Sequence, residues 1–543
     1  MNILMPKKLL FSLVFIILIG AIFIFSNKVL AATEFVSTIM ESGGDYSSLA
    51  SWETAIDTDL TVSSTKVYSV SSTTGTISDG ATVTGSVSTT TKAKVLHNST
   101  LNSQVLVQNL RNIITGTSTF STSSNIVTGT GTLYTTELVA GDYIWLESSQ
   151  TWQQVSSIAS STELTLSATS TIAGSGQSSV RGKSNFQSGE QLQVNGSNYI
   201  VISNTGDSAI ATAKIDGVWT NPDTTAVTID GWTTTSTNYI KIYTTSTARH
   251  QGKWDSAKYN LTATSGTVLN INEENVVIDG LQIHKNSNIA TTFGVDFNNT
   301  TGVSNFTLSN TIIKGNTNFT ATPQSGIAIV SNTGSGIVKL YNNIVYNFKG
   351  VTTSTIHNGI IFANSNYTIY AYNNTFYNLW TSCYRQTAGI FIAKNSIAQS
   401  CNDGFMGTFS TSSDYNISDI AGDAPNATFS TSSITVSFVS TSTSDFHLSP
   451  TDSSAKDMAT SSPATDPNLS FTTDIDGQTR TDSWDIGADE FVNTAPNAPV
   501  GLGQYTSGCS SSISTSTYWI ATSTACFMGV ISDSDLYDLE KLQ

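Results

Sequence analysis

Charged side chains are scarce in this chain of 543 residues, at 11% of the total. Globular proteins usually carry about a quarter. The 23 Lys and Arg residues are outnumbered by 39 Asp and Glu residues, which gives a formal net charge of −16. Because a phosphate backbone requires a basic surface, this balance excludes nucleic acid as a partner. It also argues against non-specific binding to an anionic membrane surface.

Histidine and the residues typical of helices are rare as well. The chain has five His, none of them clustered, and four Cys without CxxC spacing, so no transition-metal site is expected. The Glu, Lys, Leu and Ala pattern of helices is nearly absent. Ser, Thr, Asn and Gly alternate instead with short β-branched and aromatic runs, which favours strands and turns. The predicted class is all-β.

Only one apolar run is long, and it stands at the start of the chain. Lys7 and Lys8 precede the apolar residues from Leu9 to Phe25, and small residues follow at Ala31 and Ala32. This order is typical of a secretory signal peptide, residues 1–31, cleaved after Ala31. An uncleaved membrane anchor is the alternative, because the run is close to the length that spans a bilayer. The protein is therefore expected to be extracellular, either secreted or on the cell surface.

An even number of cysteines in an exported chain indicates two disulfides. Three pairings are open, and pairing of neighbours respects a domain boundary near residue 493. Buried reduced thiols are the alternative. The four cysteines are Cys383, Cys401, Cys509 and Cys526.

Between residues 275 and 400 the chain repeats itself, and the repeat predicts the architecture. Five strand-like segments superimpose, with one shared position at spacings of 30, 32, 31 and 22 residues. That position is held by Gly280, Asn310, Asn342, Asn373 and Asn395. A second set of strand-like segments recurs at Gly294, Gly326 and Gly359. Strands that return once per coil without intervening helices stack as a parallel solenoid, in which the Asn side chains can bond from coil to coil. Asn turns in an antiparallel sheet are the alternative.

The two ends of the region add a helix and a family resemblance. Residues 46–60 have the pattern of a short amphipathic helix that caps the open end of the solenoid. The segments "GGDYSSLASWETAIDTDL" and "NYIKIYTTSTARHQGKWDSAKYNL" resemble the opening of exported bacterial pectate-lyase-like β-helix proteins. "DFHLSPTDSSAKDMA" and "DIDGQTRTDSWDIGADEF" resemble the end of right-handed parallel β-helix domains of the choice-of-anchor type. The resemblance covers most of residues 33–492. It implies a right-handed β-helix and an extracellular setting. Most proteins of this kind have no assigned reaction.

These features predict a domain order. After the signal peptide come an N-terminal cap with the first coils (32–115), an inserted antiparallel β-module (116–214) and the parallel β-helix (215–444). The C-terminal end motif (445–492) is followed by a Pro-containing linker and a truncated immunoglobulin- or fibronectin-like segment (493–543).

Candidate binding residues are aromatic. Tyr341 and Tyr372 precede the Asn column at equivalent positions, Tyr346 and Tyr377 match each other, and Trp380 is near. On the outward face they would form a stripe that holds sugar rings. Packing under a loop, or stiffening of the sheet, is the alternative.

Catalytic and metal-binding patterns are weak. No catalytic residue is assigned, because matching carboxylates in successive coils and the polygalacturonase motifs are missing. No cofactor is predicted, apart from calcium at Asp533, Asp535 and Asp538, where a polar loop is the alternative.

The sequence therefore predicts a monomeric surface or secreted protein that recognises a polysaccharide or a cell-surface ligand without catalysis. A polysaccharide lyase or hydrolase and a structural spacer for surface display are the alternatives.

Overall fold

The computed structural model describes residues 32–492 with short gaps, together with residues 500–505 and 526–530. The gaps are 62–64, 74–76, 87–90, 147–150, 171–172, 178, 182–185, 187–188, 195–197, 206–208, 299–301, 331–332, 352–355, 427 and 482. The predicted signal peptide lies outside these residues. No helix among the described residues is long and apolar enough to cross a membrane.

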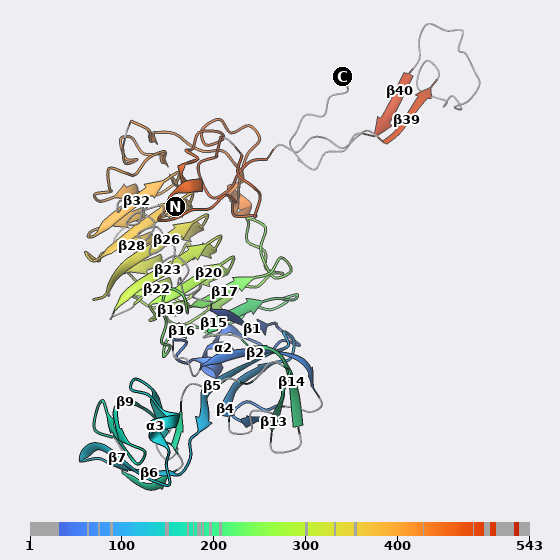
Figure 1. The fold of residues 1–543 in the computed structure, drawn as a ribbon. Coiled ribbons are helices and arrows are strands. Elements are labelled where there is room, and N and C mark those ends of the chain that lie inside the picture. Colours follow the sequence, from blue (N-terminus) through green and yellow to red (C-terminus); the bar gives the residue numbers. More distant parts are fainter. Residues whose placement is uncertain are drawn as a thin grey trace, which may run out of the picture. The chain divides into compact units, whose positions relative to one another are not determined.

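The described chain forms two compact units, each with its own core. Of the described residues, the antiparallel unit contains 32–35, Thr61–Asn98 and Gln104–Ile210, and the solenoid unit contains Val36–Leu60, Ser99–Ser103 and those from Ala211 onward. Both are drawn in Figure 1.

Three parallel sheets make the solenoid unit. Sheet 1 contains β1 (Thr33–Ile39), β15 (Ala209–Ile215), β17 (Ile240–Thr244), β20 (Asn275–Asp279), β23 (Val303–Ser309), β26 (Ser335–Tyr341), β29 (Tyr367–Tyr372) and β32 (Ile390–Lys394). Sheet 2 contains β18 (Leu261–Ala263), β21 (Gln282–Lys285), β24 (Ile312–Lys314), β27 (Ile344–Phe348), β30 (Thr375–Leu379), β33 (Ile397–Gln399), β35 (Ile417–Ser418) and β36 (Thr431–Ser432). Sheet 3 contains β16 (Val227–Ile229), β19 (Leu269–Ile271), β22 (Thr292–Phe297), β25 (Gln324–Ile329), β28 (His357–Phe362), β31 (Ser382–Gln386) and β34 (Asp403–Met406).

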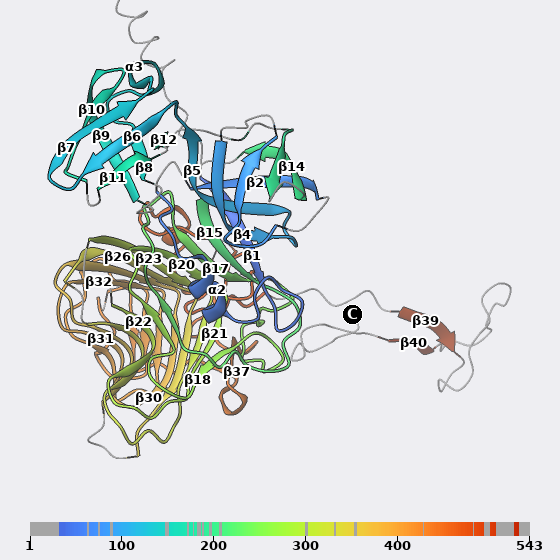
Figure 2. The same ribbon diagram turned by 90° about the horizontal axis from the view of Figure 1, so that it is seen from below.

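From β17 to β34 the chain visits the three sheets in turn, so each coil adds one strand to every sheet (Figures 1 and 2). This arrangement is a parallel β-helix, and it confirms the predicted fold class. The second set of repeats is also confirmed, because β22, β25 and β28 pair in sheet 3.

Register explains why the apolar positions repeat. In sheet 1, Ile278 pairs with Leu308, which pairs with Leu340, and all three side chains are buried. The ring of Tyr384 in sheet 3 stacks on its register partner Phe405 at 4.7 Å and on Phe376 of sheet 2 at 4.2 Å. Since alternate residues of a strand point to opposite faces, one apolar column per sheet fills the interior of the coils.

The predicted capping helix is confirmed as α2 (Leu49–Ile56). Ser48 caps its N-terminus by accepting a hydrogen bond from the Ser51 amide. Leu49, Trp52 and Ile56 are fully buried, and Trp52 stacks on Trp232 at the start of the solenoid. The helix thereby covers apolar surface that the first coils would expose.

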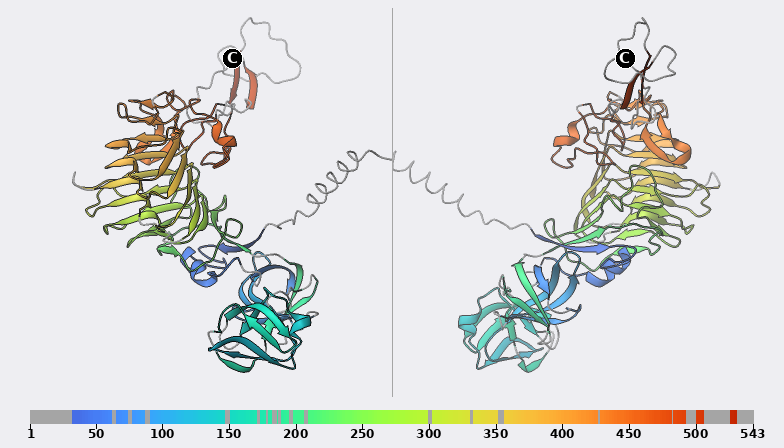
Figure 3. Two further views of the ribbon diagram at one scale, coloured as in Figure 1. Left: turned by 60° about the vertical axis from the view of Figure 1, so that its left-hand side comes forward. Right: turned by 90° about the vertical axis from the view of Figure 1, so that its right-hand side faces the viewer.

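One antiparallel sheet builds the other unit (Figure 3). Its strands are β2 (Lys66–Thr73), β3 (Thr82–Gly85), β4 (Thr91–Ser99), β5 (Gln104–Ile113), β6 (Thr117–Ser121), β7 (Ser124–Thr130), β8 (Tyr143–Leu146), β9 (Thr151–Ser160), β10 (Glu163–Leu166), β11 (Gly174–Gln177), β12 (Ser179–Arg181), β13 (Gln191–Val194) and β14 (Asn198–Thr205), with the short helix α3 (Tyr134–Glu137).

The antiparallel unit is larger than the expected insertion at 116–214. Strands β2 to β5 pair antiparallel with one another and with β13 and β14, so residues 66–113 are not the first coils of the solenoid. The physical reason is that alternation with period 2 is common to parallel and antiparallel strands. Only the coil repeat separates the two, and it is absent from these residues.

The last part of the solenoid unit contains little regular structure. It includes β37 (Phe438–Ser440), the 3-10 helix η1 (Thr441–Thr443), β38 (Asp445–Leu448) and the 3-10 helix η2 (Ser462–Thr465). We call residues 438–491 the C-terminal strap. Farther on, only β39 (Val500–Tyr505) and β40 (Cys526–Val530) are described, as an antiparallel pair.

Candidate functional site

The Asn column turns the chain between sheet 1 and sheet 2. Asn310, Asn342, Asn373 and Asn395 all have positive φ, between 49° and 53°, a conformation that Asn tolerates better than most residues. The side chain of Asn342 donates to that of Asn310 at 3.0 Å, and Asn395 donates to Asn373 at 3.0 Å. Between Asn342 and Asn373 the ladder is interrupted, because both side chains bond to the strap instead.

The strap is hydrogen-bonded to the side chains of the Asn column. Asn342 Nδ2 donates to the Thr473 carbonyl at 2.8 Å, and Asn373 Nδ2 donates to the Asp485 and Gly487 carbonyls at 3.0 and 3.2 Å. Asn395 exchanges two hydrogen bonds with the backbone of Thr460. The column therefore does more than stack coils: it holds residues 460–487 along the corner of the solenoid.

A buried ion pair closes the strap. Arg480 Nη1 lies 3.1 Å from Glu490 Oε2, and neither side chain is more than 1% exposed. Arg480 Nη2 also donates to Asn342 Oδ1 at 3.0 Å and to the Ala488 carbonyl at 2.9 Å. These bonds explain the spacing of Arg and Glu in the end motif, because one guanidinium joins two turns of the strap to the solenoid.

The predicted aromatic stripe lies beneath this strap and not at the surface. Tyr341 stacks on Phe471 with ring centroids 4.6 Å apart, and the Tyr372 hydroxyl donates to Asp466 at 3.0 Å. Tyr346 and Tyr377 both pack on Phe446. Tyr372 is 1% and Tyr346 3% exposed.

The prediction of an exposed binding stripe is therefore wrong, and packing under a loop is the observed arrangement. Trp380 is half-buried, and it takes no part in the ring contacts between the other four predicted residues and the described residues of the strap. Sequence spacing identified the outward face correctly, but it carries no information about which distant segment covers that face.

Part of the outward face of sheet 1 stays partly exposed beside the strap, where Tyr370 and Ile392 pack at the edge of a cluster that contains Leu469, Phe471 and Trp484. Register places Lys339, Tyr370 and Ile392 in one column, and Ile337, Thr368 and Ile390 in the next. All six are partly or largely exposed. We call them the lysine–tyrosine face. Sequence analysis missed it, because Tyr370 precedes the Asn column by three residues and has no aromatic partner at the same place in the other repeats.

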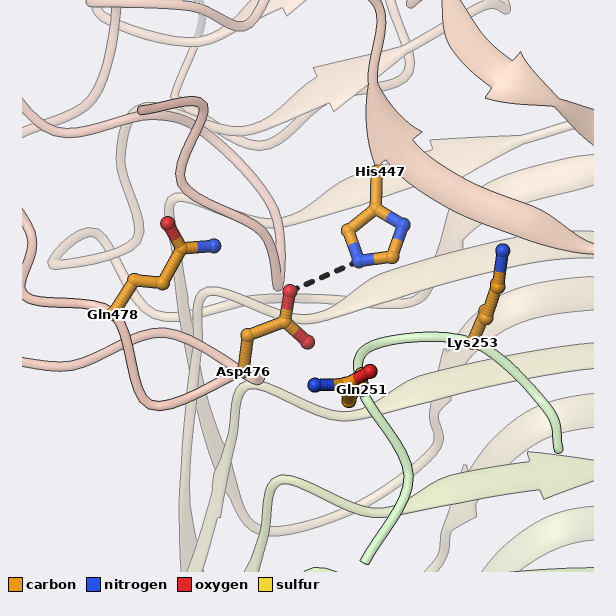
Figure 4. A pocket seen from close by; sticks show the side chains of 5 residues that line it. All are labelled: Gln251, Lys253, His447, Asp476 and Gln478. Atoms are coloured by element: carbon orange, nitrogen blue, oxygen red, sulfur yellow. Dashed lines mark hydrogen bonds and ion pairs between the residues drawn. The ribbon is translucent and has the colours of Figure 1, made fainter. Parts of the chain in front are cut away.

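A second polar cluster surrounds His447 in the strap (Figure 4). His447 Nδ1 lies 2.5 Å from Asp445 Oδ1, and Nε2 lies 3.0 Å from Asp476 Oδ2. Burial alone would lower the pKa of His447, but the bonds to these two carboxylates raise it to about 11. Lys253 contacts Asp445 at 3.1 Å.

The cluster opens on a cavity of about 410 Å³. Gln251, Lys253, His447, Asp476 and Gln478 line it. One oxygen each of Asp476 and Asp489 and one His447 nitrogen lie within 4.8 Å of one another. Burial raises the pKa of Asp489 to about 7. Sequence analysis missed this group because its members come from three separate parts of the strap and form no short motif.

Of the predicted disulfide and calcium-binding residues, the structure describes some and not others. Cys383 and Cys401 form a disulfide, with Cα atoms 5.8 Å apart, as neighbour pairing predicted. Cys509 and the three candidate calcium ligands Asp533, Asp535 and Asp538 lie outside the described residues, and of Cys526 only the backbone is described.

Fold and site together define a parallel β-helix protein with a C-terminal strap locked onto its Asn corner. Searches of protein-family models, of curated proteins and of solved structures found no match to this chain.

Proposed function

We propose that this chain is an exported cell-surface β-helix protein of the pectate-lyase-like, choice-of-anchor type that recognises a carboxylated polysaccharide without cleaving it. The lysine–tyrosine face carries this proposal. Neighbouring strands of a sheet are about 4.8 Å apart, so Lys339, Tyr370 and Ile392 form a short ladder of evenly spaced side chains. A ladder of this kind suits a polymer with a short repeat.

Two side chains of the face, Tyr370 and Lys339, suit sugar recognition. The Tyr370 ring offers an apolar surface to the C–H face of a sugar, and its hydroxyl offers a hydrogen bond. Lys339 offers a positive charge in a chain whose net charge is −16. Lys394 lies on the neighbouring column, over the ring of Tyr372. Both lysines interact with Asp466 of the strap, and Lys394 also interacts with Asp414, so a sugar carboxylate would bind these cations in competition with two acids of the chain.

Export is supported by two further observations. The Cys383–Cys401 disulfide suits an oxidising compartment. The signal-peptide pattern at residues 1–31 supplies the route.

The test is retention of the full chain on immobilised polyuronates and on neutral glucans. We expect retention on the polyuronate that weakens with salt, and at least a tenfold loss of affinity for Tyr370→Ala and for Lys339→Gln. Tyr143→Ala is the matched control, because Tyr143 is 45% exposed in the antiparallel unit.

Three outcomes contradict the proposal. Release of sugar products would show a lyase or hydrolase. Absence of retention on every glycan would favour a structural spacer. Equal losses for Tyr143→Ala and Tyr370→Ala would place binding elsewhere.

A further inference from the structure

The His447 cluster places three carboxylates of the strap around one imidazole. Asp445, Asp476 and Asp489 face this imidazole, and among the described residues the other cation paired with them is Lys253, on Asp445. Such a group requires positive charge. A proton on the imidazole supplies one unit, and a divalent ion supplies two.

The orientation of His447 favours an ion. Asp445 accepts a hydrogen bond from Nδ1, and Nε2 lies 3.0 Å from Asp476 Oδ2, so an ion bound by both would replace the proton between these two atoms. A carboxylate on the far nitrogen is the usual arrangement behind a metal-bound histidine, since it fixes the tautomer and makes the ligating nitrogen more basic.

Asp476 supplies an independent sign of a missing partner. Its Oδ1 atom is buried and makes no hydrogen bond, whereas Oδ2 bonds to His447. A buried carboxylate oxygen without a partner carries an energetic penalty, which a bound cation removes. The turn that holds it is rigid, because Asp474 Oδ1 accepts hydrogen bonds from the Asp476 and Gln478 amides.

Gly252 keeps these ligand atoms accessible. A Cβ at residue 252 would lie 2.3 Å from His447 Nε2 and 2.4 Å from Asp476 Oδ1, so any side chain would collide with both. Its φ of +66° favours glycine as well. The adjoining cavity leaves room for water on a bound ion, beside Gln251 and Gln478.

We propose that His447, Asp476 and Asp489 bind a divalent transition-metal ion such as Zn²⁺, with Asp445 as a positioning residue. One imidazole nitrogen and two carboxylate oxygens match the preferences of Zn²⁺, whereas Ca²⁺ prefers oxygen ligands throughout. The three ligands come from β38, from the turn at 474–477 and from the chain before Glu490. The ion thus links three separate parts of the strap, and the adjoining cavity leaves room for a further ligand on the ion.

The test uses the full chain, stripped with a chelator and titrated with ZnCl₂ by calorimetry, with bound metal counted by elemental analysis. We expect one Zn²⁺ per chain at this site and a higher melting temperature with Zn²⁺. Asp476→Asn and Asp489→Asn, which keep side-chain shape, should weaken binding at least tenfold. Asp445→Asn should weaken it by about 10–100-fold.

Controls separate this site from chance histidine binding and from misfolding. His284→Gln alters a histidine on β21 and should leave affinity unchanged. Gly252→Ala should abolish binding while all ligands remain, and far-UV circular dichroism checks its fold. Binding that is absent, or that survives Asp476→Asn and Asp489→Asn unchanged, would overturn the proposal and leave the imidazole proton as the cation of the cluster.

Discussion

Asn373 carries a backbone conformation and a set of hydrogen bonds at the same time. Its φ is +51°, its side chain is fully buried, and it joins the Asp485 and Gly487 carbonyls of the strap to Asn395. A β-carbon in the left-handed region is strained by about 1–2 kcal/mol, a strain that glycine escapes. Conformation and hydrogen bonding can therefore be separated by two substitutions at one position.

We predict that Asn373→Ala lowers the free energy of unfolding by about 2–4 kcal/mol, from lost hydrogen bonds and retained strain. Asn373→Gly should be about 1 kcal/mol more stable than Asn373→Ala, because it relieves the strain and loses the same bonds. Urea unfolding followed by circular dichroism measures both values. An alanine variant as stable as the glycine variant would show that the backbone conformation contributes nothing.

At the scale of elements, a buried carboxylate on helix α2, that of Glu53, joins the helix to the first coils. Glu53 Oε1 accepts from the Asp230 amide at 2.9 Å, and Oε2 accepts from Trp232 Nε1 at 3.0 Å. Burial raises the pKa of Glu53 from 4.5 to about 7, and the nearby Glu273 is raised to about 7 in the same way. A folded-state pKa above the unfolded value means that the folded protein binds more protons, so this contribution to stability falls as pH rises from about 4.5 to 7.

We predict that Glu53→Gln flattens this decline and makes the protein more stable than the parent at pH 8, by up to about 3 kcal/mol. Glutamine keeps an oxygen for the Trp232 and Asp230 donors and carries no charge. Unfolding free energies measured across the pH range provide the comparison, with the exposed Glu163→Gln as control. A parallel pH profile for Glu53→Gln and the parent would contradict the prediction.

Elements with a repeat were predictable from sequence, and contacts between distant segments were not. The Asn spacing predicted the strands on either side of it, in sheets 1 and 2, since stacking aligns equivalent residues. The spacing of Gly294, Gly326 and Gly359 predicted strands of sheet 3. The end motif was visible through Arg480 and Glu490, but its target on Asn342 is 138 residues earlier in the chain. No periodicity encodes such a contact. The burial of Tyr372 and the assembly of the His447 cluster follow from it, and both escaped prediction for that reason.

At the scale of the whole molecule, the strap and the coils share one network. Arg480 joins Glu490 to Asn342, and aromatic residues of the strap cover Tyr341 and Tyr346. Unfolding the strap alone would expose this apolar flank to water. The strap and the coils should therefore unfold together. The antiparallel unit has separate cores, one of which contains Val107, Phe186 and Leu192.

We predict two calorimetric transitions, one for each unit, that respond to different substitutions. Arg480→Met leaves Glu490 buried without its cation, which should destabilise the solenoid unit by about 3–5 kcal/mol and lower only its melting temperature, by several degrees. Leu192→Ala removes a fully buried side chain and should lower only the other transition, through a loss of about 2–5 kcal/mol. Differential scanning calorimetry of the parent and both variants measures the shifts, and hydrogen exchange assigns each transition to its unit.

If both substitutions move one common transition, the two units are a single cooperative structure. If Arg480→Met releases the strap in a separate step below the melting of the coils, the strap is an appendage and not part of the solenoid's cooperative core.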